Sequence, residues 1–245
     1  MNCLNCNTPL TGRYCSGCGQ ENRPKKLSVW QLLGQFFSGL LNYDGRLIQS
    51  ILLLFSKPSA LTIAYMEGKR SNYVNPAQFY LFTSAIYFLF SSTFSSPEKT
   101  SDSIDTDFSK EFKEGFIEDN RLPQVLFITL PLLALILKLV FIKRKHYWYI
   151  DHLIFILHIA TSFFIFLFVQ KGLELLSSST GWSIISFVSW LLGISWMIYY
   201  LISFKRFFEK GWTKTLLLFF LSSFLQSILF MVVFTLLLVF AFFNL

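Results

Sequence analysis

The sequence predicts an all-α membrane protein that crosses the bilayer about five times and carries a small N-terminal zinc ribbon with four cysteine ligands. Two observations lead to this fold class. Hydrophobic residues make up 53% of the 245 residues and charged residues only 14%, so a soluble fold would lack the polar side chains needed to cover its surface. All four cysteines lie within the first eighteen residues, in a segment that is otherwise polar. The chain therefore divides into a metal-binding head (1–22), an interfacial or re-entrant amphipathic segment (23–75) and a transmembrane helical domain (76–245).

The head is predicted from two Cys-x-x-Cys pairs. Cys3 pairs with Cys6, and Cys15 pairs with Cys18. This spacing lets a tight turn direct two thiolates at one ion, and four sulfur ligands meet the tetrahedral preference of zinc. Four cysteines leave no coordination position for water, so the zinc is expected to be structural rather than catalytic. A segment this short has little core, and metal binding would supply its folding free energy, about 10–16 kcal/mol in comparable peptides.

Two other uses of the cysteines fit the sequence less well. Disulfide bonds require an oxidising compartment, whereas the charge distribution places the N-terminus in the cytoplasm. A thioredoxin-like redox pair would stand in a βαβ unit, and none follows in the sequence. Zinc binding is therefore the preferred interpretation.

The segment from 23 to 75 is apolar in stretches too short to cross a bilayer. Residues 29–41 have the spacing of an amphipathic helix at the membrane interface. Residues 47–55, bracketed by Arg46 and Lys57, fall well short of the about 20 residues that a spanning helix needs. The sequence leaves open whether 47–56 is interfacial or re-entrant.

Helix boundary signals follow in the same segment. Pro58 can begin a further helical turn, and Gly68 is placed to end it. Asn75 before Pro76 is a suitable N-cap for the first spanning helix. The transmembrane domain is thus expected to begin at Pro76.

Five apolar stretches are long enough to cross a hydrocarbon core of about 30 Å. They are approximately 76–96, 122–142, 147–170, 182–204 and 215–242. Lysine and arginine concentrate before the first stretch, after the second and after the fourth, whereas acidic residues dilute them between the first and second. Because positively charged loops stay in the cytoplasm, the N-terminus is predicted to be cytoplasmic and the C-terminus outside. The expected location is a bacterial inner membrane.

Short motifs near the head carry a family resemblance. They are Asp44 in "LNYDGR", "SKPS" around Pro58, and "YMEGKRSNYVNP" from Tyr65 to Pro76. With these motifs the chain resembles a bacterial membrane family called domain of unknown function 3667. Ser50 and Ser59 depart from the threonine and glycine frequent in that family. The resemblance implies a zinc ribbon followed by several spans, and it implies no particular activity because the family has none established.

Two groups of polar residues are candidate sites besides the cysteines. Lys69 and Arg70, with Asp44 near by, could bind an anionic lipid or a phosphorylated ligand, although anchoring of the first span by the positive-inside rule is the preferred interpretation. Asp151 and His158 lie on one face of the third span and could form an intramembrane polar site. A single buried histidine bonded to a neighbouring helix is the preferred interpretation of His158.

Three functions are consistent with these features. The preferred one is a non-enzymatic scaffold or sensor whose cytoplasmic zinc ribbon docks a protein partner, with membrane lipids as its surroundings. The alternatives are a small-molecule or lipid transporter and a membrane-bound lipid-modifying enzyme. The sequence shows no catalytic set of serine, cysteine or paired carboxylates, so an enzyme is not expected. Nucleic acid is not expected as a partner, because the head has few basic residues and one aromatic residue.

Overall fold

The computed structural model describes residues 2–21, 45–94, 122–142, 147–180 and 182–243. The regular structure in these residues is helical, apart from two isolated β-bridges in the head. The helices are α2 (Arg46–Ser56), α3 (Ala60–Met66), α4 (Pro76–Phe94), α6 (Leu122–Val140), α7 (Tyr149–Thr180), α8 (Ser183–Phe208) and α9 (Trp212–Phe243). The predicted interfacial helix at 29–41 and the acidic loop before the second span lie outside the described residues.

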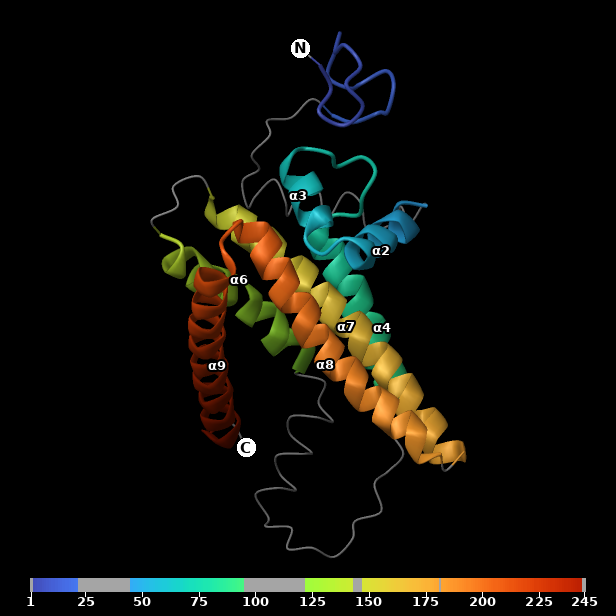
Figure 1. Cartoon of the computed structure of the whole chain (residues 1–245), viewed down its shortest axis with the longest axis vertical. Coiled ribbons are helices and arrows are strands. Elements are labelled where there is room, and N and C mark those ends of the chain that lie inside the picture. The colour runs from blue at the N-terminus through green and yellow to red at the C-terminus, as the bar shows by residue number, and fades with distance from the viewer. Residues whose placement is uncertain (1, 22–44, 95–121, 143–146, 181, 244–245) are drawn as a thin grey trace, which may run out of the picture.

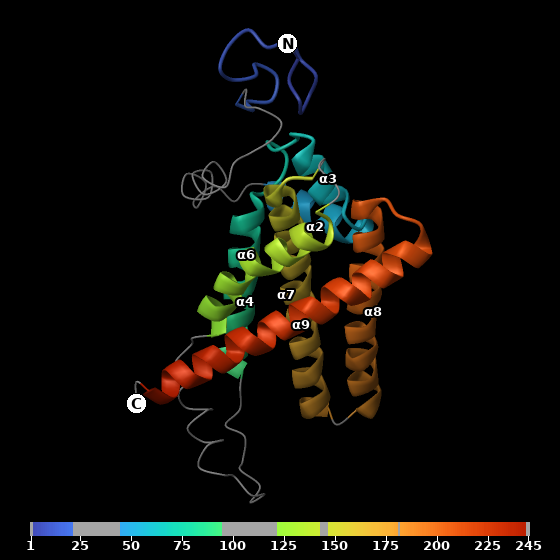
Figure 2. The same cartoon turned by 90° about the vertical axis from the view of Figure 1, so that its left-hand side faces the viewer.

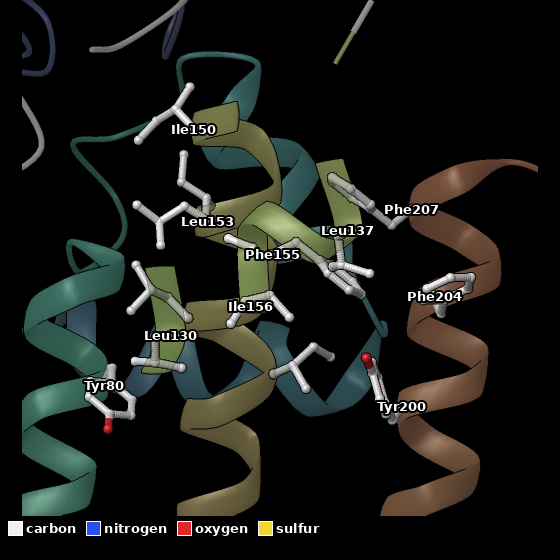
Figure 3. Packing of buried hydrophobic residues seen from close by; sticks show 14 of the residues in the cluster. Tyr80, Leu130, Leu137, Ile150, Leu153, Phe155, Ile156, Tyr200, Phe204 and Phe207 are labelled. Atoms are coloured by element: carbon white, nitrogen blue, oxygen red, sulfur yellow. The ribbon is translucent and has the colours of Figure 1, made fainter. Parts of the chain in front are cut away.

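Five long helices alternate in direction, beginning with α4, which runs away from the end of the bundle that bears the head (Figures 1 and 2). Helix α7 lies at the centre and packs against α4, α6 and α8. Its first turns are buried almost all round, from Ile150 to Ile159. Figure 3 shows Leu137 of α6, Phe207 of α8 and Phe155 of α7, which are all buried between these helices. Helix α9 contacts α6 and α8 and crosses the bundle at a steep angle (Figure 2).

Three helical segments of the described residues are long and apolar enough to cross a membrane. They are α7, residues 187–208 of α8 and residues 212–233 of α9. In length and composition these three segments are typical of a membrane protein. Helices α4 and α6 coincide with the first two predicted spans. Neither is among the helices that meet the criterion of length and composition, so the five spans stay a prediction.

Helix α7 extends beyond the predicted third span. The third span is expected to end near residue 170, whereas the helix continues to Thr180. Lys171 and Glu174 form an ion pair one turn apart, with Nζ and Oε2 3.9 Å from each other. The hydroxyl groups of Ser178, Ser179 and Thr180 donate to the carbonyls of Leu175 and Leu176, three or four residues earlier in the same helix, so these polar side chains are satisfied within the helix itself.

Helices α2 and α3 form a hairpin against the side of the bundle. Leu54 of α2 and Leu61 of α3 pack with Phe79 of α4 in a small core of their own. The ring of Phe55 lies 5.6 Å from that of Phe166 and 5.9 Å from that of Tyr199, which are interior positions of α7 and α8 rather than their ends. The hairpin is therefore packed on the inner parts of α7 and α8.

Candidate metal centre and its docking site

The four cysteine side chains of the head converge on one point. All four Sγ atoms lie within 4.8 Å of one another. Cys3 and Cys18 approach to 3.6 Å and Cys6 and Cys15 to 3.5 Å, measured between Sγ atoms. Sulfur ligands about 2.3 Å from a tetrahedral ion stand roughly 3.8 Å apart. The cluster therefore has the spacing and the donor chemistry of a metal site.

Two turns with the same hydrogen-bond pattern bring the thiols together. We call residues 3–8 the first knuckle and residues 15–20 the second. In each knuckle the residue four after the first cysteine, Asn7 or Gly19, donates its N–H to that cysteine's carbonyl at 2.9 Å. These two residues have φ angles of +61° and +69°, a conformation that glycine adopts freely and asparagine tolerates. The equal geometry aims both pairs of thiols at the same point.

The first knuckle also favours the thiolate form that binds metal. Hydrogen bonds from the side chain and then from the backbone of Thr8 lower the pKa of Cys6 to about 6. The Thr8 hydroxyl lies 3.2 Å from Cys6 Sγ. Because a thiolate rather than a thiol is the ligand, Cys6 is prepared for coordination at neutral pH.

The head contacts the helical body through the turn between α3 and α4, residues 68–72, which we call the docking turn. The side-chain amide of Gln20 hydrogen-bonds to the backbone of this turn. Its Nε2 donates to Gly68 O at 2.7 Å, and its Oε1 accepts from the N–H groups of Arg70 and Ser71, both at 3.1 Å. One side chain of the second knuckle thus binds three main-chain groups.

The first knuckle adds two contacts to the same turn. Asn5 Nδ2 donates to Asn72 Oδ1 at 3.2 Å. Leu4 covers Gly68 so closely that a methyl group at Gly68 would lie 2.7 Å from Leu4 Cδ1, and the φ of Gly68 is +96°. Glycine is therefore required here twice, for its backbone angle and for the approach of the head.

Lys69 and Arg70, which the sequence predicts as contacts for an anionic lipid or ligand, each interact with a neighbouring residue of the chain. Lys69 Nζ lies 2.9 Å from Glu67 Oε2, and both side chains are nearly half exposed. This hydrogen bond raises the pKa of Lys69. The guanidinium of Arg70 lies 5.7 Å from the centre of the Tyr65 ring, and its Nε donates to Tyr65 O at 3.4 Å. Asp44, the third residue of this predicted site, lies outside the described residues.

Asp151 and His158 each have a separate hydrogen-bond partner. Asp151 Oδ2 accepts from Trp148 N at 2.8 Å, so the carboxylate caps the first turn of α7. His158 Nδ1 is bonded to Thr62 Oγ1 of α3 at 2.9 Å, and both residues are buried. A histidine bonded to a neighbouring helix is the interpretation that the sequence favours, and α3 is that neighbour.

The hairpin of α2 and α3 is joined to the later helices by two further buried hydrogen bonds. Tyr199 OH donates to Leu54 O at 2.8 Å. Ser59 Oγ donates to Ser203 O at 2.6 Å. Together with the Thr62 bond, they fix both helices of the hairpin, and hence the start of the docking turn, to α7 and α8.

The hairpin and the docking turn lie in a segment that matches a known protein family. Residues 44–88 match the family described as protein of unknown function (DUF3667). The resemblance predicted from the sequence is thereby confirmed over this segment. The DUF3667 segment includes α2, α3, the docking turn and most of α4, so the head is docked on it. Comparisons with curated proteins and with solved structures gave no match.

Sequence reasoning finds the four thiols but misses the residues that dock them. Gln20 stands two residues after Cys18, outside any metal motif, and a glutamine in a polar segment carries no signal of its own. Thr62 is also missed, because a threonine within an apolar helix is common. Gly68 of the docking turn is identified as a helix end and as part of the family motif, but not as a contact of the head.

Proposed function

We propose that this protein is a non-enzymatic scaffold or sensor of a bacterial inner membrane, whose zinc-folded head presents a cytoplasmic surface to a protein partner. The observation that carries the proposal is the convergence of four thiols in a head attached to the body by one side. Four sulfur ligands complete the coordination of zinc, so the ion would hold a fold rather than activate a substrate.

The proposed partner surface lies on the part of the head that the docking turn leaves exposed. Tyr14 is 57% exposed. The guanidinium of Arg13 lies 5.8 Å from the centre of the Tyr14 ring, and its Nε lies 3.3 Å from Glu21 Oε1. Tyrosine and arginine are enriched among the residues that dominate protein interfaces. A tyrosine prearranged by its neighbour suits recognition of another protein.

We propose five spans, with α4 and α6 added to the three helices that meet the length and composition criterion. The alternating directions of α4, α6, α7, α8 and α9 support this count (Figures 1 and 2). Lys205 and Arg206 lie in the last turn of α8, at the end of the bundle that bears the head. By the positive-inside rule this end is cytoplasmic, which supports a cytoplasmic head.

Crosslinking in native membranes tests the proposed function. The intact protein is captured after crosslinking, and its partners are compared with those of Tyr14→Ala and of Cys15→Ser/Cys18→Ser. We expect one set of proteins to be lost from both variants and retained by Thr11→Ala, an exposed control in the same head. Identical crosslinked partners in all four proteins would contradict the proposal. Accessibility labelling of a cysteine placed at position 11 checks the topology, and labelling from the outside would contradict the cytoplasmic head.

A further inference from the structure

The described contacts between head and body come from residues of the two knuckles. Leu4 and Asn5 lie between the cysteines of the first pair. Gln20 is the last residue of the second knuckle, and its carbonyl accepts the N–H of Cys15 at 2.9 Å. The residues that dock the head are therefore placed by the same turns that place the thiols.

The body side of the interface is main chain as well as side chain. Gln20 satisfies a carbonyl and two N–H groups of the docking turn, and a turn outside a helix has no helical partners for such groups. When the head leaves, these groups return to water. The docking turn is thus ordered in part by the head, although α3 and α4 hold its two ends.

These observations connect metal binding to the body. A head of this size has little core, so without metal its knuckles are not expected to persist. Gln20 would then lose the backbone geometry that directs its amide at the turn. A bound ion stabilises the knuckles, and the knuckles in turn hold Leu4, Asn5 and Gln20 in the docking arrangement.

We propose that the docking turn of the DUF3667 segment is the binding site for the chain's own metal-loaded head, so that metal binding and docking form one coupled equilibrium. By thermodynamic reciprocity, docking raises the metal affinity by the same factor by which metal promotes docking. The inference rests on the metal-binding part of the proposed function and is independent of any protein partner.

A series of side-chain contacts connects the docking turn to the interior of the bundle. Arg70, whose N–H binds Gln20, packs on the ring of Tyr65 at the end of α3. The Tyr65 ring lies 6.5 Å from that of His158, which is bonded to Thr62 of α3. Metal-dependent docking therefore acts on a turn that is continuous with a helix packed on α7.

Hydrogen exchange of the intact chain in detergent measures docking. Peptides that include residues 68–72 are compared in zinc-loaded protein and after chelation. We expect exchange in these peptides to rise on chelation, because the N–H groups of Arg70 and Ser71 lose their acceptor. Gln20→Ala should show the same rise with zinc bound, whereas Ser16→Ala, an exposed residue of the second knuckle, should behave like the unaltered chain.

Zinc affinity, measured by competition with a chelator, provides the reciprocal test. We expect Gln20→Ala to bind zinc roughly tenfold more weakly than Ser16→Ala, within the usual range of coupling between sites. Asn72→Ala, which removes from the body side the acceptor of Asn5 Nδ2 and of Ser71 Oγ, should also weaken zinc binding, by a few-fold. Neither variant removes a cysteine.

Three results would overturn the inference. The first is exchange in the docking turn that is the same with and without zinc. The second is equal zinc affinity in Gln20→Ala and Ser16→Ala. The third applies if Gln20→Ala fails to bind zinc at all: an unaltered affinity in Asn72→Ala then excludes coupling. A chain that never binds zinc would contradict the proposed function as well, which distinguishes the two failures.

Discussion

The hydrogen bond between Thr62 and His158 offers a quantitative test of how the DUF3667 segment is fixed to the bundle. The two side chains are 2% and 1% exposed and lie 2.9 Å apart. Thr62→Val keeps the volume and removes the hydroxyl. His158 Nε2 already has no hydrogen-bond partner among the described residues, so the variant would leave both imidazole nitrogens unpaired.

The expected loss of stability follows from the cost of a buried unpaired group. Such a group costs about 1–3 kcal/mol in soluble proteins, and hydrogen bonds between membrane helices average about 0.6 kcal/mol with a maximum near 1.7. We therefore expect Thr62→Val to lower the free energy of unfolding by about 1 kcal/mol. Thr161→Val is the matched control, because Thr161 is also buried and, among the described residues, its hydroxyl bonds only to Leu157 O of its own helix.

Equilibrium unfolding in mixed detergent micelles, with a rising fraction of SDS, measures the effect. A double-mutant cycle with His158→Phe isolates the pair. We expect the two substitutions to be non-additive by about 1 kcal/mol, since either one alone removes the bond. Additive effects, or an equal loss in Thr161→Val, would refute the reasoning and leave α3 attached by apolar packing.

Substitutions at two further residues test the helix caps. Asp151→Ala removes the acceptor of Trp148 N and should lower the free energy of unfolding by about 1 kcal/mol. Asp151→Asn should lower it by less, because the amide oxygen still accepts the hydrogen bond. Equal losses in both variants would show that the negative charge, and not the hydrogen bond, stabilises the helix. Asn75 Oδ1 accepts from Ala77 N at 3.0 Å, so Asn75→Ala should cost about 1 kcal/mol and Asn75→Asp little. Unchanged unfolding midpoints in both alanine variants would contradict these roles.

Much of the architecture follows from the sequence because it depends on local rules. Pro76 begins α4 at its first position with Asn75 as the cap, as the Asn-Pro pair predicts. Gly68 has the positive φ expected of a residue that ends a helix. Each knuckle is closed by a hydrogen bond between residues four apart, from Asn7 N to Cys3 O and from Gly19 N to Cys15 O, so each Cys-x-x-Cys turn is a short-range structure. In each case neighbouring residues determine the geometry.

The relations between distant segments could not be predicted in the same way. The docking of Gln20 on Gly68 joins residues 48 positions apart, and no periodicity in the sequence records it. The position of α2 along the bundle depends on which aromatic rings of α7 and α8 contact Phe55, and composition does not specify them. The continuation of α7 beyond the predicted span could not be read from the sequence, because the charges of Lys171 and Glu174 resemble those of a loop, whereas the two side chains pair on one helix. Tertiary contacts and solvated helix ends decide these features.

Elemental analysis of the purified intact protein tests the central claim most directly. The account predicts about one zinc ion per chain, retained through extensive dialysis and lost in Cys15→Ser/Cys18→Ser. A chain isolated without any transition metal, or one whose metal content is the same in the double variant, would contradict it.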